Sequence, residues 1–279
     1  MTKRIWIAVI GLAAVAIVGG AVTMFGWMVD ETHFDRPSAG FDRLTTQVEA
    51  LPGVSVDDAG RWVEAPAFWA PISHIGLTVD EANLPELLET ACATEPGESI
   101  SWSLSIETNG GAIVSVHGEP SGGCLDVGFD VAGFVAEAGR LVPGLDLQPT
   151  IWDDDQFALV ALEDRPGSIS TLLPLVDHAD ELLDAAGLGS TGSVEINSSA
   201  LILVVQEGEN DRYVALLTEL VDQHGVTNYW ADGGGTPIDG VTKVQVTAPD
   251  REQGGIEAAI RASGLHVADL PVRFIPSNP

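Results

Sequence analysis

Apolar side chains recur at helical spacing in three segments of the chain, at 131–142, 172–186 and 214–224. In each segment they fall at positions i, i+3, i+4 and i+7, which places them on one face of an α-helix. A glycine or a proline follows each segment, as is typical of a helix end. The pattern therefore predicts three amphipathic helices. Shorter helices are expected at 42–51, 84–93 and 254–263.

Strict alternation of serine with apolar residues marks the clearest strand, at 99–107. One apolar face and one polar face are typical of an antiparallel sheet that packs on the core with one side only. Asn109-Gly110-Gly111 then predicts a tight turn into a second strand at 113–116. A similar hairpin is expected within 193–206, with Asn197-Ser198-Ser199 as its turn.

The elements repeat along the chain. Strands expected at 75–79, 157–162 and 241–246 each precede a helix, and they start 82 and then 84 residues apart. Tryptophans follow three of the helix-ending glycines by five to nine residues, at Trp62, Trp152 and Trp230. This periodicity indicates duplicated units.

The order of these elements predicts an α+β fold of repeated split βαβ units, the ferredoxin-like arrangement, with largely antiparallel sheets. Unit one is expected at 73–155 and unit two at 156–232. An N-terminal αβ element at 41–72 and a C-terminal βαβ element at 241–276 could pair as a third, incomplete unit. A rival grouping counts three consecutive units from the N-terminal element, which places the turn at 109–111 between domains. Turn chemistry favours the first grouping.

Residues 5–29 carry no charge over 25 positions. A helix of this length spans roughly 37 Å, enough to cross a hydrocarbon core of about 30 Å. Two basic residues precede the segment and two acidic residues follow it, which places the N-terminus in the cytoplasm. We expect residues 1–29 to form a cytoplasmic stub and a transmembrane signal-anchor, and 30–40 to form a polar connector. A cleaved signal peptide is the alternative.

Charge narrows the range of partners. The chain has 41 acidic against 12 basic residues, a formal net charge of −29, and Lys243 is the only lysine beyond the N-terminus. Phosphate binding needs clusters of lysine and arginine, so the composition argues against a nucleic-acid partner. With 45% hydrophobic residues, the chain can still build a substantial core.

Two cysteines in an extracytoplasmic domain suggest one disulfide bond. Cys92 falls in the last turn of the helix expected at 84–93, and Cys124 falls in the loop that leads into the helix beginning near Asp130. The two helices of a split βαβ unit are antiparallel, so the end of the first lies near the start of the second. The fold therefore predicts a Cys92–Cys124 bond.

Motifs for catalysis and cofactor binding are weak. Residues 187–192 read GxGxxG, but they follow a helix and lead into a strand, the reverse of the dinucleotide-binding order. His178, Asp180 and Glu181 are interpreted as a solvated helix face, and His224 as a residue that complements a helix dipole. We therefore predict no catalytic residue and no cofactor.

Acidic turns supply the only candidates for a metal site. Asp153, Asp154 and Asp155 form the densest group, but the spacing of a calcium-binding loop is absent. Asp232 and Asp239 flank a glycine-rich loop and are a more distant candidate. Solvated turns explain both groups, so no metal site is predicted.

Trp62, Phe68 and Trp69 are interleaved with prolines in one segment. Such aromatics form either an exposed recognition patch or a plug between two units, and we favour the plug.

Taken together, the sequence predicts a single-pass, membrane-anchored, extracytoplasmic binding or scaffold protein of the cell envelope, held in the membrane by residues 5–29, with an envelope protein as candidate partner. The alternatives are an envelope enzyme that uses an Asp-cluster metal site and a structural accessory subunit of a membrane complex.

Overall fold

The computed structural model describes residues 33–64, 69–94, 97–121, 124–152, 155–162, 168–189, 192–231 and 241–276. The predicted membrane segment 5–29 lies outside these ranges. Within them, no helix combines the length and the apolar character needed to cross a bilayer. The membrane anchor therefore stays a prediction.

The chain has an α+β fold in which twelve strands of the described residues form one mixed sheet and seven α-helices connect them. The strands are β1 (His33–Asp35), β2 (Val54–Glu64), β3 (Ile72–Asp80), β4 (Ile100–Glu107), β5 (Ile113–Ser121), β6 (Asp146–Ile151), β7 (Phe157–Ala161), β8 (Ser193–Asn197), β9 (Leu201–Gln206), β10 (Asn228–Ala231), β11 (Val244–Thr247) and β12 (Val272–Ile275). The helices are α2 (Ala39–Glu49), α3 (Leu84–Ala93), α4 (Val131–Leu141), α5 (Ile169–Asp177), α6 (Ala179–Ala185), α7 (Asn210–His224) and α8 (Gln253–Ala262).

The sheet follows the chain strand by strand, from β1 to β12. From β3 onward, the two strands that flank a helix are parallel neighbours, and an antiparallel pairing leads to the next pair. The strands β3, β5, β7, β9 and β11 start at residues 72, 113, 157, 201 and 244, so the steps are 41, 44, 44 and 43 residues. The sequence period of 82 to 84 residues therefore contains two structural repeats. Each structural repeat consists of two strands and the helical segment between them.

The predicted split βαβ topology is wrong. In a split unit, a third strand lies between the two strands that flank a helix. Here β3 pairs directly with β4 around α3, and β5 with β6 around α4. The sheet has six antiparallel and five parallel pairings, so it is mixed and not largely antiparallel. The first strand of each repeat pairs with the last strand of the repeat before it, so the sheet continues along the chain. A ferredoxin-like unit would instead end as a separate sheet of four strands.

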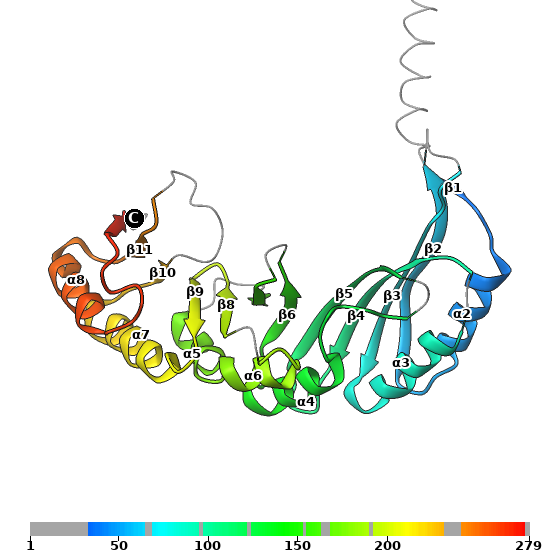
Figure 1. Cartoon of the computed structure of the whole chain (residues 1–279), viewed down its shortest axis with the longest axis horizontal. Coiled ribbons are helices and arrows are strands. Elements are labelled where there is room, and N and C mark those ends of the chain that lie inside the picture. The colour runs from blue at the N-terminus through cyan, green and yellow to red at the C-terminus, as the bar shows by residue number, and fades with distance from the viewer. Residues whose placement is uncertain are drawn as a thin grey trace, which may run out of the picture.

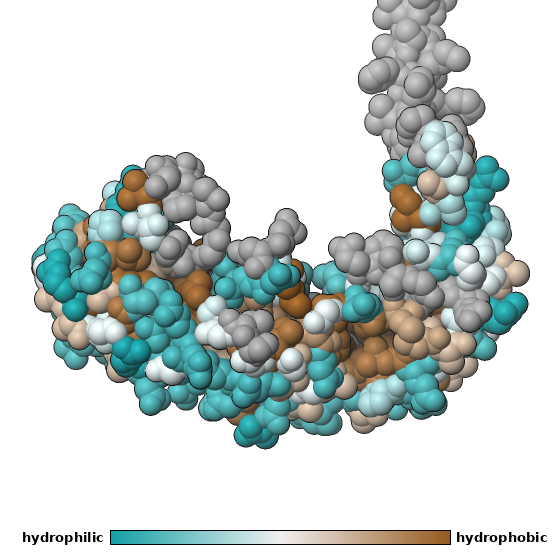
Figure 2. Space-filling model, in the orientation of Figure 1, coloured by the Kyte–Doolittle hydropathy of each residue, from teal (hydrophilic) through white to brown (hydrophobic). Residues whose placement is uncertain are grey.

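The helices lie along the outer, convex side of an open curve, and the strands line its inner side (Figure 1). Polar side chains cover the outer edge, while apolar side chains gather between the helices and the strands (Figure 2). The core is therefore one continuous layer, which the buried apolar residues of every repeat join. In the described part of the chain no helix covers the inner side of the sheet, which we call the open face.

Local sequence explains most of the elements. The alternation in β4 is confirmed, because its apolar residues are buried and its serines are half-buried. Helix α4 begins where the Asp130 carboxylate accepts a hydrogen bond from the Gly133 N–H at 3.0 Å, which caps the first turn. Within the predicted connector 30–40, residues 33–35 form β1 along β2, and Ser38 caps α2.

The helix predicted at 172–186 is broken into α5 and α6 at His178. Pro174 lies inside α5, where it lacks the N–H that would continue the helical hydrogen bonds. The backbone of His178 then leaves helical geometry, at φ −106° and ψ 19°. The Asn210 side-chain amide donates to the carbonyls of the last two residues of α5, both at 3.1 Å. The break therefore leaves these carbonyls partnered.

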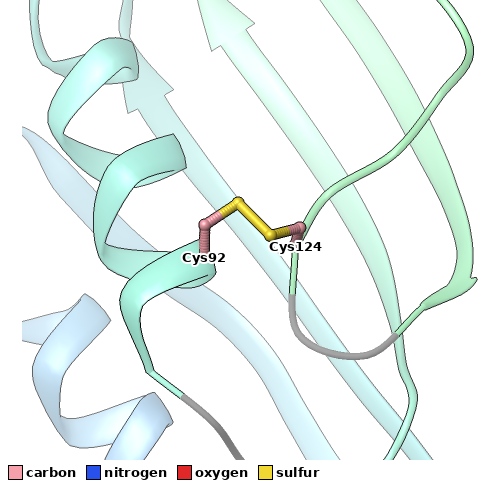
Figure 3. The surroundings of a disulfide bond; sticks show 2 residues. All are labelled: Cys92 and Cys124. Atoms are coloured by element: carbon pink, nitrogen blue, oxygen red, sulfur yellow. A yellow bond between two sulfur atoms is a disulfide. The ribbon is translucent and has the colours of Figure 1, made fainter.

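The predicted disulfide is confirmed, with the Cα atoms of Cys92 and Cys124 4.2 Å apart. The bond joins the end of α3 to the loop before α4 (Figure 3). Because β4 and β5 are antiparallel, α3 and α4 run in opposite directions in this topology too. The prediction therefore holds although the split arrangement from which it was argued does not.

Candidate functional site

Polar side chains line the open face where β3, β4 and β5 run side by side. His74 lies beside Ser101 and Gly76 beside Ser103 in the β3–β4 pairing, and Ser103 lies beside His117 in the β4–β5 pairing. These positions alternate with the buried apolar residues of the same strands. Because successive side chains of a strand point to opposite faces, this polar set projects from the open face.

A shallow cavity of about 280 Å³ lies within this polar set. A bulge in β2 between Val56 and Asp58 brings two consecutive acids to its rim. The Thr78 hydroxyl donates to the Asp57 carboxylate at 2.7 Å and holds that side chain in place. The polar residues that line the cavity include Asp57, Asp58, His74, Ser103, Ser115 and His117.

Two glycines leave room on the open face for the larger side chains beside them. A Cβ at Gly76 would lie 3.4 Å from Nε2 of His74 and 3.7 Å from Cβ of Asp58, so these two side chains flank the glycine. A Cβ at Gly60 would lie 3.1 Å from Cζ3 of Trp62. The half-buried ring of Trp62 therefore lies over Gly60, which pairs with His74 across the β2–β3 ladder.

The three recurring tryptophans all occupy open-face positions. Trp62 lies within β2, where its indole N–H donates to Glu64 at 3.3 Å. Trp152 directly follows β6 and is 41% exposed, and Trp230 alternates with buried neighbours in β10. These strands are four apart, which corresponds to roughly 19 Å between successive tryptophans at about 4.8 Å per strand. The sequence repeat therefore places one tryptophan in every second structural repeat of the open face.

Charge is distributed unevenly around this face. No lysine or arginine occurs between Arg61 and Arg140, a stretch that contains 12 acidic residues. Arg61 itself belongs to the helix-covered side, where its guanidinium donates to Glu98 at 2.7 Å. At the far end of the sheet, Arg273 of β12 lies beside Gln245 of β11. By strand alternation, the open face carries the acids Asp57, Asp58, Glu64, Asp80 and Glu107 over β2 to β4, and Arg273 lies on the same face at β12.

The predicted recognition segment is only partly described. Trp62 lies in the sheet and Trp69 is 81% exposed, while Phe68 is outside the described residues. Asp153, Asp154, Asp232 and Asp239 are also outside them, and Asp155 is exposed in a turn with a φ of 63°. Among the described residues, no group of three or more His, Cys, Asp or Glu side chains is placed to hold a metal ion.

The other polar residues singled out in the sequence have local partners. His178 lies 3.6 Å from Glu181, and the Asp180 carboxylate accepts from the Gly208 N–H at 3.3 Å. Burial raises the pKa of Asp180. His224, at the end of α7, lies 3.0 Å from Glu252, and this hydrogen bond lowers the pKa of the Glu252 carboxyl. The structure brings none of these residues to the open face. The GxGxxG segment lies between α6 and β8, as predicted.

A buried polar cluster on the helix side has no signal in the sequence. Glu209 is 5% exposed, and its carboxylate accepts from the backbone N–H of His266 at 3.0 Å and contacts Nδ1 of that residue at 2.7 Å. The ring of Tyr213 lies edge-on to His266, with centroids 6.2 Å apart. Burial raises the pKa of Tyr213 and of Tyr229. This cluster connects α7 to the segment after α8.

Sequence reasoning also missed the cavity on the open face. The serines of β4 mark a polar face, but His74, His117 and the two acids of the bulge stand far apart in the chain with no recognisable spacing. Only the strand register brings them together. A prediction of the site would have required the order of the strands.

The fold and the site together define a repeat protein of the α+β class, with helices on one side of a single curved sheet and an open, partly aromatic face on the other. Comparison of the chain with family models, with curated proteins and with solved structures finds no match.

Proposed function

We propose that this chain is a membrane-anchored, extracytoplasmic binding protein of the cell envelope that holds its partner on the open face of the sheet. The observation that carries the proposal is the one-sided architecture, in which helices line the convex side and strands line the concave side (Figure 1). Curved repeat proteins use such concave surfaces as extended binding sites.

The side chains on this face support the proposal. Tryptophan is enriched at the centres of binding interfaces, because its large ring buries much apolar area and its N–H finds a partner. Trp62 and Trp152 supply such rings, and the serines of β4 supply hydroxyl groups between them. A surface that mixes aromatic and small polar groups suits recognition of another molecule.

The expected location rests on the sequence. The uncharged segment 5–29 supports an anchor with the remaining chain outside the cytoplasm. The Cys92–Cys124 pair agrees with that location, because disulfide bonds persist in oxidising compartments.

Site-specific photo-crosslinking in intact cells tests the proposal. We would place benzoylphenylalanine at Ser103, on the open face, and at Glu86, on the exposed side of α3. Illumination should give a discrete adduct from position 103 and none of the same species from position 86. Adducts from position 86 alone would place binding on the helices and contradict the proposal.

A further inference from the structure

The open face is acidic over β2 to β4. On the open side of β2, β3 and β4, the charged side chains other than histidine are acidic, namely Glu64, Asp80 and Glu107. Asp57 and Asp58 are exposed beside them on the β2 bulge, and the nearest base in sequence, Arg61, is paired with Glu98 on the other side of the sheet. Complementary charge steers association and selects partners, so this face attracts cations and repels anions.

The cavity on the open face is small. Its volume of about 280 Å³ is below the range of roughly 300–1,000 Å³ that is typical of small-molecule sites. The cavity is also shallow and lies on an open sheet. These dimensions suit a single side chain of a larger partner better than a whole metabolite.

An aromatic ring lies on the same face as the acids of the cavity rim. Trp62 lies over Gly60, and Asp58 is two positions before that glycine on the same face. A lysine or arginine side chain above an indole ring gains a cation–π interaction, and tryptophan is the strongest aromatic partner. Asp58 can form an ion pair with the same cation. Ring and carboxylate together recognise one basic side chain.

From these observations we infer that the open face over β2 to β5 binds a basic, extended polypeptide segment, with one lysine or arginine between Trp62 and Asp58. The inference rests on the proposed function and names its partner class. The half-buried serines Ser101, Ser103 and Ser105 offer hydroxyl groups to the polar backbone of the segment.

Binding of a labelled probe peptide to the full-length chain in detergent micelles tests the inference. The probe is a dodecapeptide of alternating lysine and glycine, and the comparison ligands are its glutamate counterpart and chitohexaose, a neutral glycan. We expect the lysine peptide to bind and the other two to fail. The double substitution Asp57→Asn/Asp58→Asn should weaken binding roughly threefold to tenfold. Trp62→Leu should weaken it by a similar factor.

The matched control is Glu86→Gln/Glu89→Gln, which removes the same charge from the exposed side of α3. It should change the dissociation constant less than twofold. Equal weakening by both double variants would show nonspecific attraction and overturn the inference. Binding of chitohexaose in place of the lysine peptide would also overturn it and would assign the face to a glycan. In either case an adduct from position 103 would still support the proposed function, whereas loss of that adduct would contradict it.

Discussion

The carboxylate of Glu209 lies 2.7 Å from Nδ1 of His266, although the two residues are 57 positions apart in the chain. Glu209 directly precedes α7, and His266 follows α8. Their contact therefore connects the last two helices of the sheet's C-terminal end. Because the carboxylate is buried, the hydrogen bonds from His266 compensate for its loss of water.

Removal of the His266 side chain should destabilise this end of the protein. His266→Ala removes the ring donor and leaves the buried Glu209 carboxylate with only the backbone N–H of residue 266 and the Arg212 guanidinium at 3.5 Å, at a cost of about 1–3 kcal/mol in free energy of unfolding. Urea denaturation of the full-length chain measures the change. As a control, Arg251→Ala removes an exposed side chain of the same region and should cost less than about 0.5 kcal/mol. Equal effects of the two substitutions would contradict the prediction.

Reduction of the disulfide should destabilise the repeat that contains α3. The Cys92–Cys124 bond closes a loop of 124 − 92 + 1 = 33 residues, for which chain entropy predicts a contribution of about 3–4 kcal/mol. Non-reducing peptide mapping should recover the two cysteines in one linked peptide, and the melting temperature should fall after reduction. Alkylation of both cysteines in the unfolded, unreduced protein would show that the bond is absent.

Gly110 should tolerate no side chain. A Cβ at this position, in the β4–β5 turn, would lie 1.8 Å from the carbonyl oxygen of Gly139 in α4. Gly110→Ala must therefore separate the turn from the helix, and we expect a loss of about 1–3 kcal/mol. Gly254→Ala is the matched control, because it adds a Cβ to α8 in open space and should stabilise that helix by about 0.5–1 kcal/mol. Thermal denaturation compares the two variants, and a neutral Gly110→Ala would refute the close approach.

The membrane anchor makes a separate prediction. If residues 5–29 cross the bilayer with the N-terminus inside, protease added to intact cells should degrade the chain beyond residue 30. Carbonate washing should leave the full-length protein in the membrane fraction. A soluble mature form in the medium would indicate a cleaved signal peptide and would remove the anchor from the proposed function.

Local patterns determined the elements of this protein. The serine alternation of β4 and the helical spacing of α4 were readable because each depends on residues a few positions apart. The same holds for Asp130 as a helix cap, since its carboxylate reaches an N–H three residues away. The Cys92–Cys124 pair was also predictable, because it requires only that consecutive helices run in opposite directions.

Tertiary structure alone decided which strands are neighbours. The sequence pattern of a βαβ segment is the same whether its two strands pair directly or are separated by a third strand. The strand order depends on hydrogen bonds between segments that are distant in the chain. The direct pairing of β3 with β4 and of β5 with β6 creates one curved sheet, gathers His74, His117 and the bulge acids, and aligns the recurring tryptophans on its open face. The sequence by itself therefore determined the repeating elements and their polar and apolar sides, whereas the candidate binding face exists only through strand register, which no local pattern encodes.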